Sequence, residues 1–139
     1  MTDPELPQPL QILFADDNRF LGDAVALHLN AAGYHVEVVA DGFEAWNSIS
    51  ENLGRFQVLV TDHRMPGISG LELVHLLKEA NFTGWIISYS GALTLEEREN
   101  YRSLGVAVVE KTTRTEDLLA TIKRLTTGTT ARRAKNSRP

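Results

Sequence analysis

Five short runs of apolar residues, separated by longer segments of mixed polarity, constrain the fold of this chain more than any other feature. Within each run the apolar residues follow one another without alternation, and several of them are β-branched. This pattern predicts strands that are covered on both faces, as in a parallel sheet. The runs are Leu10–Ala15, His35–Val39, Gln57–Thr61, Trp85–Tyr89 and Val106–Val109.

The mixed segments carry helical end signals. Gly33 stands where a left-handed residue would end the first helix, and the last three helices start with capping boxes. Strand and helix alternate five times, so we predict an α/β fold of (βα)5 type, a doubly wound sandwich around a five-stranded parallel sheet. The predicted helices are Arg19–Ala32, Phe43–Asn52, Gly70–Ala80, Leu95–Ser103 and Arg114–Thr126, and the boxes pair Ser69 with Glu72, Thr94 with Glu97 and Thr113 with Glu116.

The 139 residues suffice for one domain, which we expect over residues 10–126. Three prolines predict an extended lead-in over residues 1–9, and the polar composition of residues 127–139 predicts a flexible basic tail. The formal net charge of −4 argues against a dedicated nucleic-acid binder. The tail could nevertheless contact an acidic partner, since it holds Arg132, Arg133, Lys135 and Arg138 and no acidic residue.

Several classes of protein are excluded by residues that the sequence lacks. Without cysteine there is no disulfide scaffold, thiolate zinc site or cysteine nucleophile. No apolar run approaches the ~20 residues that a membrane helix needs. The start, Met1 to Glu5, is acidic and does not resemble a signal peptide, so we expect a cytoplasmic protein with no membrane contact.

Acidic and polar side chains gather where the predicted strands end. Asp16 and Asp17 follow the first strand, Asp62 follows the third, and Ser90 and Lys111 follow the fourth and fifth. The carboxyl ends of parallel strands form the working edge of such a sheet. One aspartate alone could be a helix cap, but three like charges in one pocket repel each other unless a divalent cation holds them. Oxygen ligands without Cys or clustered His favour Mg²⁺.

A magnesium site of this kind is normally completed by phosphate oxygens, which points to phosphoryl chemistry. A carboxylate can act as the nucleophile and become an aspartyl phosphate. Lys111 offers a compact positive charge, and Ser90 offers a hydroxyl donor for the phosphoryl oxygens. Phosphoryl transfer asks a protein mainly for positioning and charge neutralisation, which a metal and a lysine supply.

Taken together, these residues resemble the receiver domain of two-component response regulators. The resemblance covers residues 10–125 and implies a flavodoxin-like sheet with strand order 2-1-3-4-5. It rests on the acidic pair, an Asp-x-x-Met-Pro-x-x-x-Gly stretch, a small hydroxyl residue and a lysine: Asp16 and Asp17, Asp62 to Gly70, Ser90, and Lys111.

The resemblance implies a role for each acidic residue. Asp62 would accept a phosphoryl group from a phosphohistidine on a sensor histidine kinase or a phosphotransfer protein. Mg²⁺ would be held by Asp17, Asp62 and the backbone carbonyl of Arg64, with Asp16 acting through a metal-bound water.

The resemblance also implies how the signal leaves the site. Ser90 and Lys111 would contact the phosphoryl oxygens and pass their presence to a face made of the fourth helix, fifth strand and fifth helix. That face would meet a downstream protein and could pair two copies of the chain. The phosphoryl group would then leave slowly by hydrolysis, catalysed by the domain itself or by a partner.

The sequence departs from the family pattern at three places. Val108 stands where the family usually has Phe or Tyr, and the sequence places neither Tyr89 nor Tyr101 as its substitute. Thr112 follows the lysine where proline is usual, so the Lys111–Thr112 peptide is expected to be trans. The positions two beyond Asp62 and Ser90, which line the path of attacking water in the family, are Arg64 and Ala92.

These departures leave other functions open. Val108 and Thr112 suit a protein-interaction module of the same fold that works without phosphorylation. A flavodoxin-like cofactor binder would need a phosphate loop after the first strand, where Asp16 and Asp17 would repel phosphate. A haloacid-dehalogenase-type phosphatase would place its nucleophile there and add a cap. The four histidines share no spacing that builds a metal site, and His63 is assigned no catalytic role.

Overall fold

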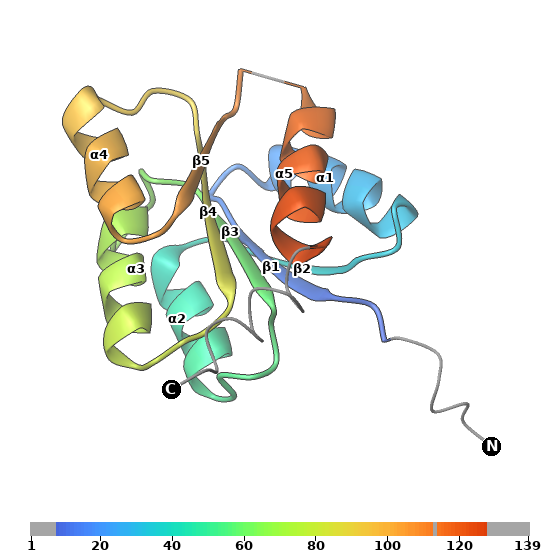
Figure 1. The fold of residues 1–139 in the computed structure, drawn as a ribbon, viewed down its shortest axis with the longest axis horizontal. Helices are drawn as coiled ribbons and strands as arrows, with labels where there is room; N and C mark the ends of the chain where they lie inside the picture. Colours follow the sequence, from blue (N-terminus) through green and yellow to red (C-terminus); the bar gives the residue numbers. More distant parts are fainter. Residues whose placement is uncertain (1–7, 113, 128–139) are drawn as a thin grey trace.

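The computed structural model describes residues 8–112 and 114–127, and shows strands and helices in strict alternation (Figure 1). The strands are β1 (Gln11–Ala15), β2 (His35–Val39), β3 (Val58–Thr61), β4 (Trp85–Ser90) and β5 (Ala107–Glu110). The helices are α1 (Arg19–Ala31), α2 (Gly42–Ser50), α3 (Gly70–Glu79), α4 (Leu95–Ser103) and α5 (Thr115–Thr127). The predicted elements are therefore confirmed, with bounds that differ by at most two residues.

The five strands form one parallel sheet in the order β2-β1-β3-β4-β5. Strand β1 lies between β2 and β3, since Ile12 aligns with Val36 of β2 on one side and with Val58 of β3 on the other. The order confirms the predicted doubly wound (βα)5 fold. Its consequence is that the carboxyl ends of β1, β3, β4 and β5 come together at one edge.

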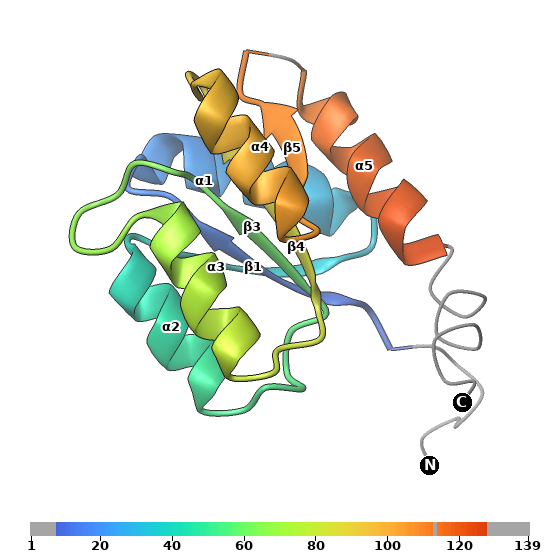
Figure 2. The ribbon, with the colours of Figure 1, turned by 60° about the vertical axis from the view of Figure 1, so that its left-hand side comes forward.

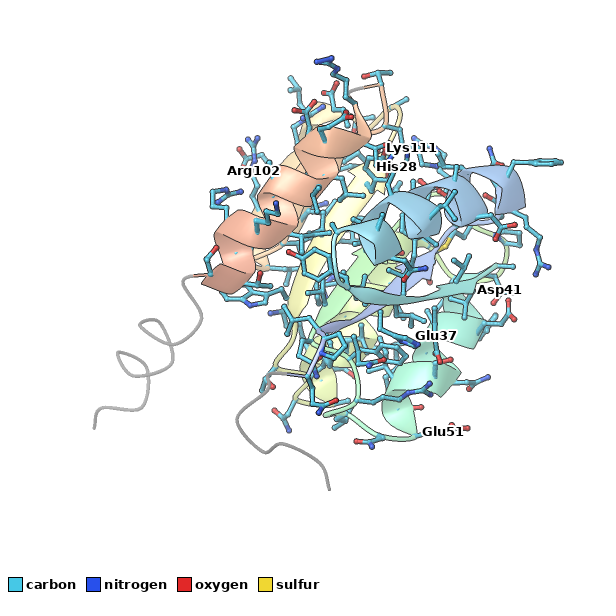
Figure 3. The ribbon with its side chains drawn as sticks, turned by 90° about the vertical axis from the view of Figure 1, so that its right-hand side faces the viewer. His28, Glu37, Asp41, Glu51, Arg102 and Lys111 are labelled. Atoms are coloured by element: carbon cyan, nitrogen blue, oxygen red, sulfur yellow. The ribbon has the colours of Figure 1, made fainter. Side chains whose placement is uncertain are left out.

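Helices cover both faces of the sheet, which explains the continuous apolar runs. On one face α2, α3 and α4 pack against alternate strand residues such as Leu13 and Leu59. On the other face α1 and α5 pack against the residues between them, including Ile12 and Phe14 (Figures 1 and 3). Each helix therefore has a fixed side of the sheet, and α4 and α5 lie on either side of β5 (Figure 2).

Side-chain caps determine where four of the helices begin. Asn18 caps α1 and Asp41 caps α2. The predicted boxes at Ser69 and Thr94 are both present. In each box the hydroxyl accepts from a Glu N–H, and that Glu accepts from the N–H of the capping residue. Gly33 has the predicted positive φ of 101° after α1.

Three of the predicted features involve residues outside the described ranges. The third capping box needs Thr113, which lies outside the described residues. Residues 1–7 of the predicted lead-in and residues 128–139 of the predicted tail also lie outside them, and Thr127 is the last residue of α5. Within the part of the chain that the structure describes, no helix combines the length and apolar character needed to cross a bilayer.

Candidate functional site

The strand ends bring Asp16, Asp62 and Lys111 to one pocket. Asp16 follows β1, Asp62 follows β3 and Lys111 follows β5. The ladder continues past the strands, since Asp62 N–H donates to the Ala15 carbonyl at 2.9 Å and Lys111 N–H donates to the Ser90 carbonyl at 3.1 Å. The backbone that carries these side chains is therefore fixed by the sheet itself.

Lys111 bridges two of the carboxylates. Its Nζ lies 2.7 Å from Asp16 Oδ2 and 2.8 Å from Asp62 Oδ2. The Lys111 side chain is 22% exposed, that of Asp62 12% and that of Asp16 only 1%. One ammonium thus faces two carboxylates in a place that water reaches poorly, where charge interactions are stronger than at an open surface.

Burial and neighbouring charges shift the pKa values of Asp16 and Lys111. Desolvation raises the pKa of the Asp16 carboxyl, and the Asp62 charge adds to this, although Lys111 and the Asn18 N–H oppose it. For Lys111, burial opposes the charged form, but the hydrogen bonds and charges of Asp16 and Asp62 outweigh it and raise the pKa. The raised pKa keeps the Lys111 ammonium positive between the two aspartates.

The donor set fits a hard divalent cation. Carboxylate oxygens of Asp16, Asp17 and Asp62 lie within 4.8 Å of one another. Asp16 Oδ2 is buried and faces the Lys111 ammonium at 2.7 Å, and no other described residue donates to it, so it can still accept from a water or face a cation. All three donors are oxygens, which suits Mg²⁺ better than a soft metal.

Ser90 and the backbone of His63 complete the floor of the pocket. The His63 N–H is shared between Asp62 Oδ1 at 2.8 Å and Ser90 Oγ at 2.9 Å. Ser90 is 3% exposed, so its side chain is buried beside Asp62. The predicted hydroxyl residue therefore lies next to Asp62, joined to it by one amide.

Arg64 extends over the loop that follows β4. Its guanidinium donates to the Ala92 carbonyl at 2.9 Å and reaches the Glu97 carboxylate of α4 at 3.4 Å. The Arg64 side chain is 61% exposed, so it lies at the solvent-facing edge of the site and not among its buried residues. The two positions singled out in the sequence, 64 and 92, are thus directly connected.

A polar contact that no pattern in the sequence predicts joins the site to α4. The His63 imidazole is buried, with Nδ1 2.5 Å from the Tyr101 hydroxyl and Nε2 2.8 Å from Glu97 Oε2. Burial raises the pKa of Tyr101, so its hydroxyl keeps its proton and can donate a hydrogen bond. The signal available in the sequence was a single aromatic residue in the segment 95–103, where Leu95 is the only other apolar residue.

The structure shows what surrounds two of the positions at which the sequence departs from the family pattern, Val108 and Thr112. Val108 lies partly buried against the core under α2, α3 and α4, whereas Tyr89 is on the opposite face, edge-on to Phe14. No cis peptide bond occurs in residues 8–112 or 114–127, so the Lys111–Thr112 peptide is trans as predicted. Of the two tyrosines, Tyr101 is therefore the one that contacts the site.

Comparison with known proteins agrees with this geometry. The family model described as "Response regulator receiver domain" matches residues 12–123. The sensor protein EvgS of Escherichia coli strain K12 is 36% identical over 104 residues, which are 73% of this chain and 8% of that protein. Response regulator MprA of Mycobacterium sp. strain KMS is 37% identical over 70 residues, 50% of this chain and 30% of that protein.

The solved structures extend the likeness to the whole fold. The chemotaxis response regulator CheY4 of Vibrio cholerae has a TM-score of 0.75 and 28% identity, covering 84% of this chain and 98% of that one. The chain thus matches a whole receiver in structure, but only a small part of the two longer curated relatives. What those longer proteins do as a whole is not carried over by the match.

Proposed function

Because this chain belongs to the response regulator receiver domain family, we propose that Asp62 accepts a phosphoryl group and that the chain acts as a switch in a two-component phosphorelay. The observation that carries the proposal is the Lys111 ammonium, which pairs with both Asp62 and Asp16. A carboxylate held beside an ammonium suits a nucleophile that receives phosphate, because the positive charge offsets that of the incoming phosphoryl oxygens. The donor would be a phosphohistidine on a sensor histidine kinase or a phosphotransfer protein.

In the proposed reaction a carboxylate oxygen of Asp62 attacks the phosphorus atom. The new P–O bond forms as the P–N bond to the donor imidazole breaks, and the imidazole leaves with a proton from solvent. Lys111 exchanges part of its contact with the carboxylates for a phosphoryl oxygen. Ser90 can donate its hydroxyl to a second oxygen, because its Oγ accepts from the His63 N–H and has only a long contact of 3.5 Å with Ser88 Oγ to give up. These are positioning and charge-neutralising roles, as phosphoryl transfer requires.

Asp17 and Asp62 would hold Mg²⁺, together with the backbone carbonyl of Arg64, and Asp16 would act through a water. When bound, the cation would neutralise charge on the carboxylates and the phosphoryl oxygens. The exposed position of Asp17 leaves room for the waters that Mg²⁺ keeps. Removal of the cation with a chelator should therefore stop phosphorylation of Asp62.

We expect the signal to reach a downstream protein through the face formed by α4, β5 and α5, in which the two helices lie on either side of the strand (Figure 2). Lys111 follows β5 directly, so a change in its contacts acts at the end of this face. The same face is where two copies of the chain could pair. Loss of the phosphoryl group would be slow hydrolysis, with Arg64 at the rim of the pocket.

Acetyl phosphate with Mg²⁺ tests the proposal by intact mass. The wild-type chain should gain the mass of one phosphoryl group, and Asp62→Asn should gain none. The matched control is Asp23→Asn, which removes an exposed aspartate on α1 and should be phosphorylated normally. A wild-type chain that stays unmodified would refute the proposal, and a modified Asp62→Asn chain would show that another residue is the acceptor.

An interaction module that works without phosphorylation is the second candidate, favoured by Val108 in place of the usual aromatic. It predicts the same partner binding for wild-type chain and Asp62→Asn, whatever the phosphodonor. The contact between Tyr101 and His63 counts against it, because the site is then connected to α4 without an aromatic at position 108.

A further inference from the structure

We infer that the side chains of His63, Tyr101 and Glu97 couple the state of Asp62 to helix α4, and so replace the missing aromatic at position 108. The inference rests on the proposed function, because it assumes that Asp62 is the residue whose state changes. Its basis is a chain of polar contacts that leaves the pocket at Asp62 and ends on α4.

The first link is the backbone of His63. Its N–H is shared between Asp62 Oδ1 at 2.8 Å and Ser90 Oγ at 2.9 Å. A group bound to Asp62 that also recruits the Ser90 hydroxyl changes both of these acceptors at once. The position of the His63 residue is therefore set by the two side chains that the proposed reaction alters.

The second link is the imidazole of His63, which is buried and holds two residues of α4. Nδ1 lies 2.5 Å from the Tyr101 hydroxyl, and Nε2 lies 2.8 Å from Glu97 Oε2. The rings of His63 and Tyr101 also meet edge to face, with centroids 5.5 Å apart. Because protein interiors are close-packed, the imidazole cannot move without moving these partners or breaking their contacts.

A second path reaches the same hydroxyl from Ser90. Ser90 Oγ lies 3.5 Å from Ser88 Oγ on the same strand, and Ser88 is hydrogen-bonded to Tyr101. Gly70 packs closely against the Tyr101 hydroxyl and the Asp62 backbone. A Cβ at Gly70 would lie 2.7 Å from Tyr101 Oη and 2.3 Å from the Asp62 carbonyl oxygen, so only glycine fits between them.

Helix α4, which would receive the change, has few apolar contacts with the rest of the protein. Among the residues of α4, all of which the structure describes, Tyr101 is the only buried one. Glu97 holds the first turn by accepting from the Thr94 N–H at 2.9 Å, and the same carboxylate contacts His63 and Arg64. Arg98 of α4 also pairs with Glu110 of β5 at 2.6 Å. A helix with one buried side chain, held largely by polar contacts, can shift when the loop that makes some of those contacts shifts.

Beryllofluoride with Mg²⁺ can test the coupling by ¹H–¹⁵N NMR, because it would mimic the phosphoryl group on Asp62. In the wild-type chain, amide shifts should change at the site, at Asp17, Ser90 and Lys111, and also along α4. Tyr101→Phe keeps the ring and removes only the hydroxyl. We expect it to keep the site shifts and to lose at least half of the shifts in α4, and His63→Gln should do the same.

Tyr89→Phe is the matched control, since Tyr89 is also a buried tyrosine but packs on the opposite face of the sheet. It should keep both sets of shifts. The inference is overturned if Tyr101→Phe retains the full α4 response, or if Tyr89→Phe loses as much. If the wild-type chain shows no shifts at the site, the proposed function itself is wrong and the coupling falls with it. Thermal unfolding verifies that each variant is folded.

Discussion

Helices α3 and α4 lie on the same side of the sheet and start with the same kind of capping box, yet they are held in place by different forces (Figure 2). Helix α3 buries an apolar stripe against the sheet, whereas α4, described in full, buries Tyr101 alone. The buried residues of α3 are Gly70, Leu73, Val74 and Leu77.

The two boxes differ in what their glutamates do besides capping. Glu72 caps α3 from an exposed position. Glu97 caps α4 and also contacts His63 and Arg64, the two residues that follow Asp62. A helix with an apolar stripe stays where the core is, and a helix held by polar contacts to the site can respond to the site. The same capping box can therefore have a structural role alone in α3 and a regulatory role as well in α4.

The largest effect should come from cutting the apolar attachment of α3. Leu77 is fully buried, so Leu77→Ala should lower the free energy of unfolding by about 2–5 kcal/mol. Leu95→Ala on α4 removes the same atoms from a side chain that is 82% exposed, and should change it by less than about 0.5 kcal/mol. Denaturant unfolding measures both. Similar losses of unfolding free energy in the two variants would mean that α4, like α3, is stabilised by apolar contacts.

The next effect separates the two capping boxes. Glu97→Ala removes a cap and also leaves the buried His63 Nε2 without this partner, which should cost about 1–3 kcal/mol. Glu72→Ala removes only a cap at an exposed position and should cost about 0.5 kcal/mol. Equal losses in urea unfolding would contradict a special role for Glu97.

A smaller effect is expected at the rim of the pocket. Arg64→Asn removes the guanidinium that joins Ala92 to Glu97 and keeps the backbone carbonyl, so water should reach a phosphorylated Asp62 more easily. The lifetime of the aspartyl phosphate should shorten by up to about tenfold, equivalent to about 1.4 kcal/mol in the barrier to hydrolysis. Arg102→Asn, at an exposed position on α4, is the control. An unchanged or longer lifetime in Arg64→Asn would argue against shielding.

The smallest effect concerns pH. The Thr94 N–H, with help from His63 and Arg64, lowers the pKa of the Glu97 carboxyl below its ordinary value of 4.5, although burial opposes this. A lowered pKa in the folded state means that the stabilisation is present above pH 4.5 and is lost as the pH falls through the folded pKa. Carbon-detected NMR of the Glu97 carboxyl should give a midpoint below 4.5, and Arg64→Ala should raise that midpoint slightly. A midpoint at or above 4.5 would contradict these contacts.

Much of the fold was predictable because it depends on local patterns. Continuous apolar runs gave the strands of a sheet covered on both faces, and the hydroxyl and Glu spacing gave the starts of α3 and α4. The pocket followed from the rule that strand ends meet at one edge, which placed Asp16, Asp62 and Lys111 together.

The coupling to α4 was not predictable in the same way. His63 and Tyr101 are 38 residues apart, and their contact depends on how α4 packs, which no spacing in the sequence encodes. The same holds for Arg64, whose side chain crosses to the β4–α4 loop. Contacts between loops and helix ends are set by tertiary packing, so a sequence can suggest the residues but not their partners.

Hydrogen exchange with and without beryllofluoride and Mg²⁺ tests most directly the claim that the state of Asp62 is passed to α4 and not to α3. The prediction is a changed rate of amide exchange across residues 95–103, an unchanged rate across residues 70–79, and no change in either helix for Asp62→Asn. Binding at the site with an equal change in both helices, or with none in α4, would contradict the account.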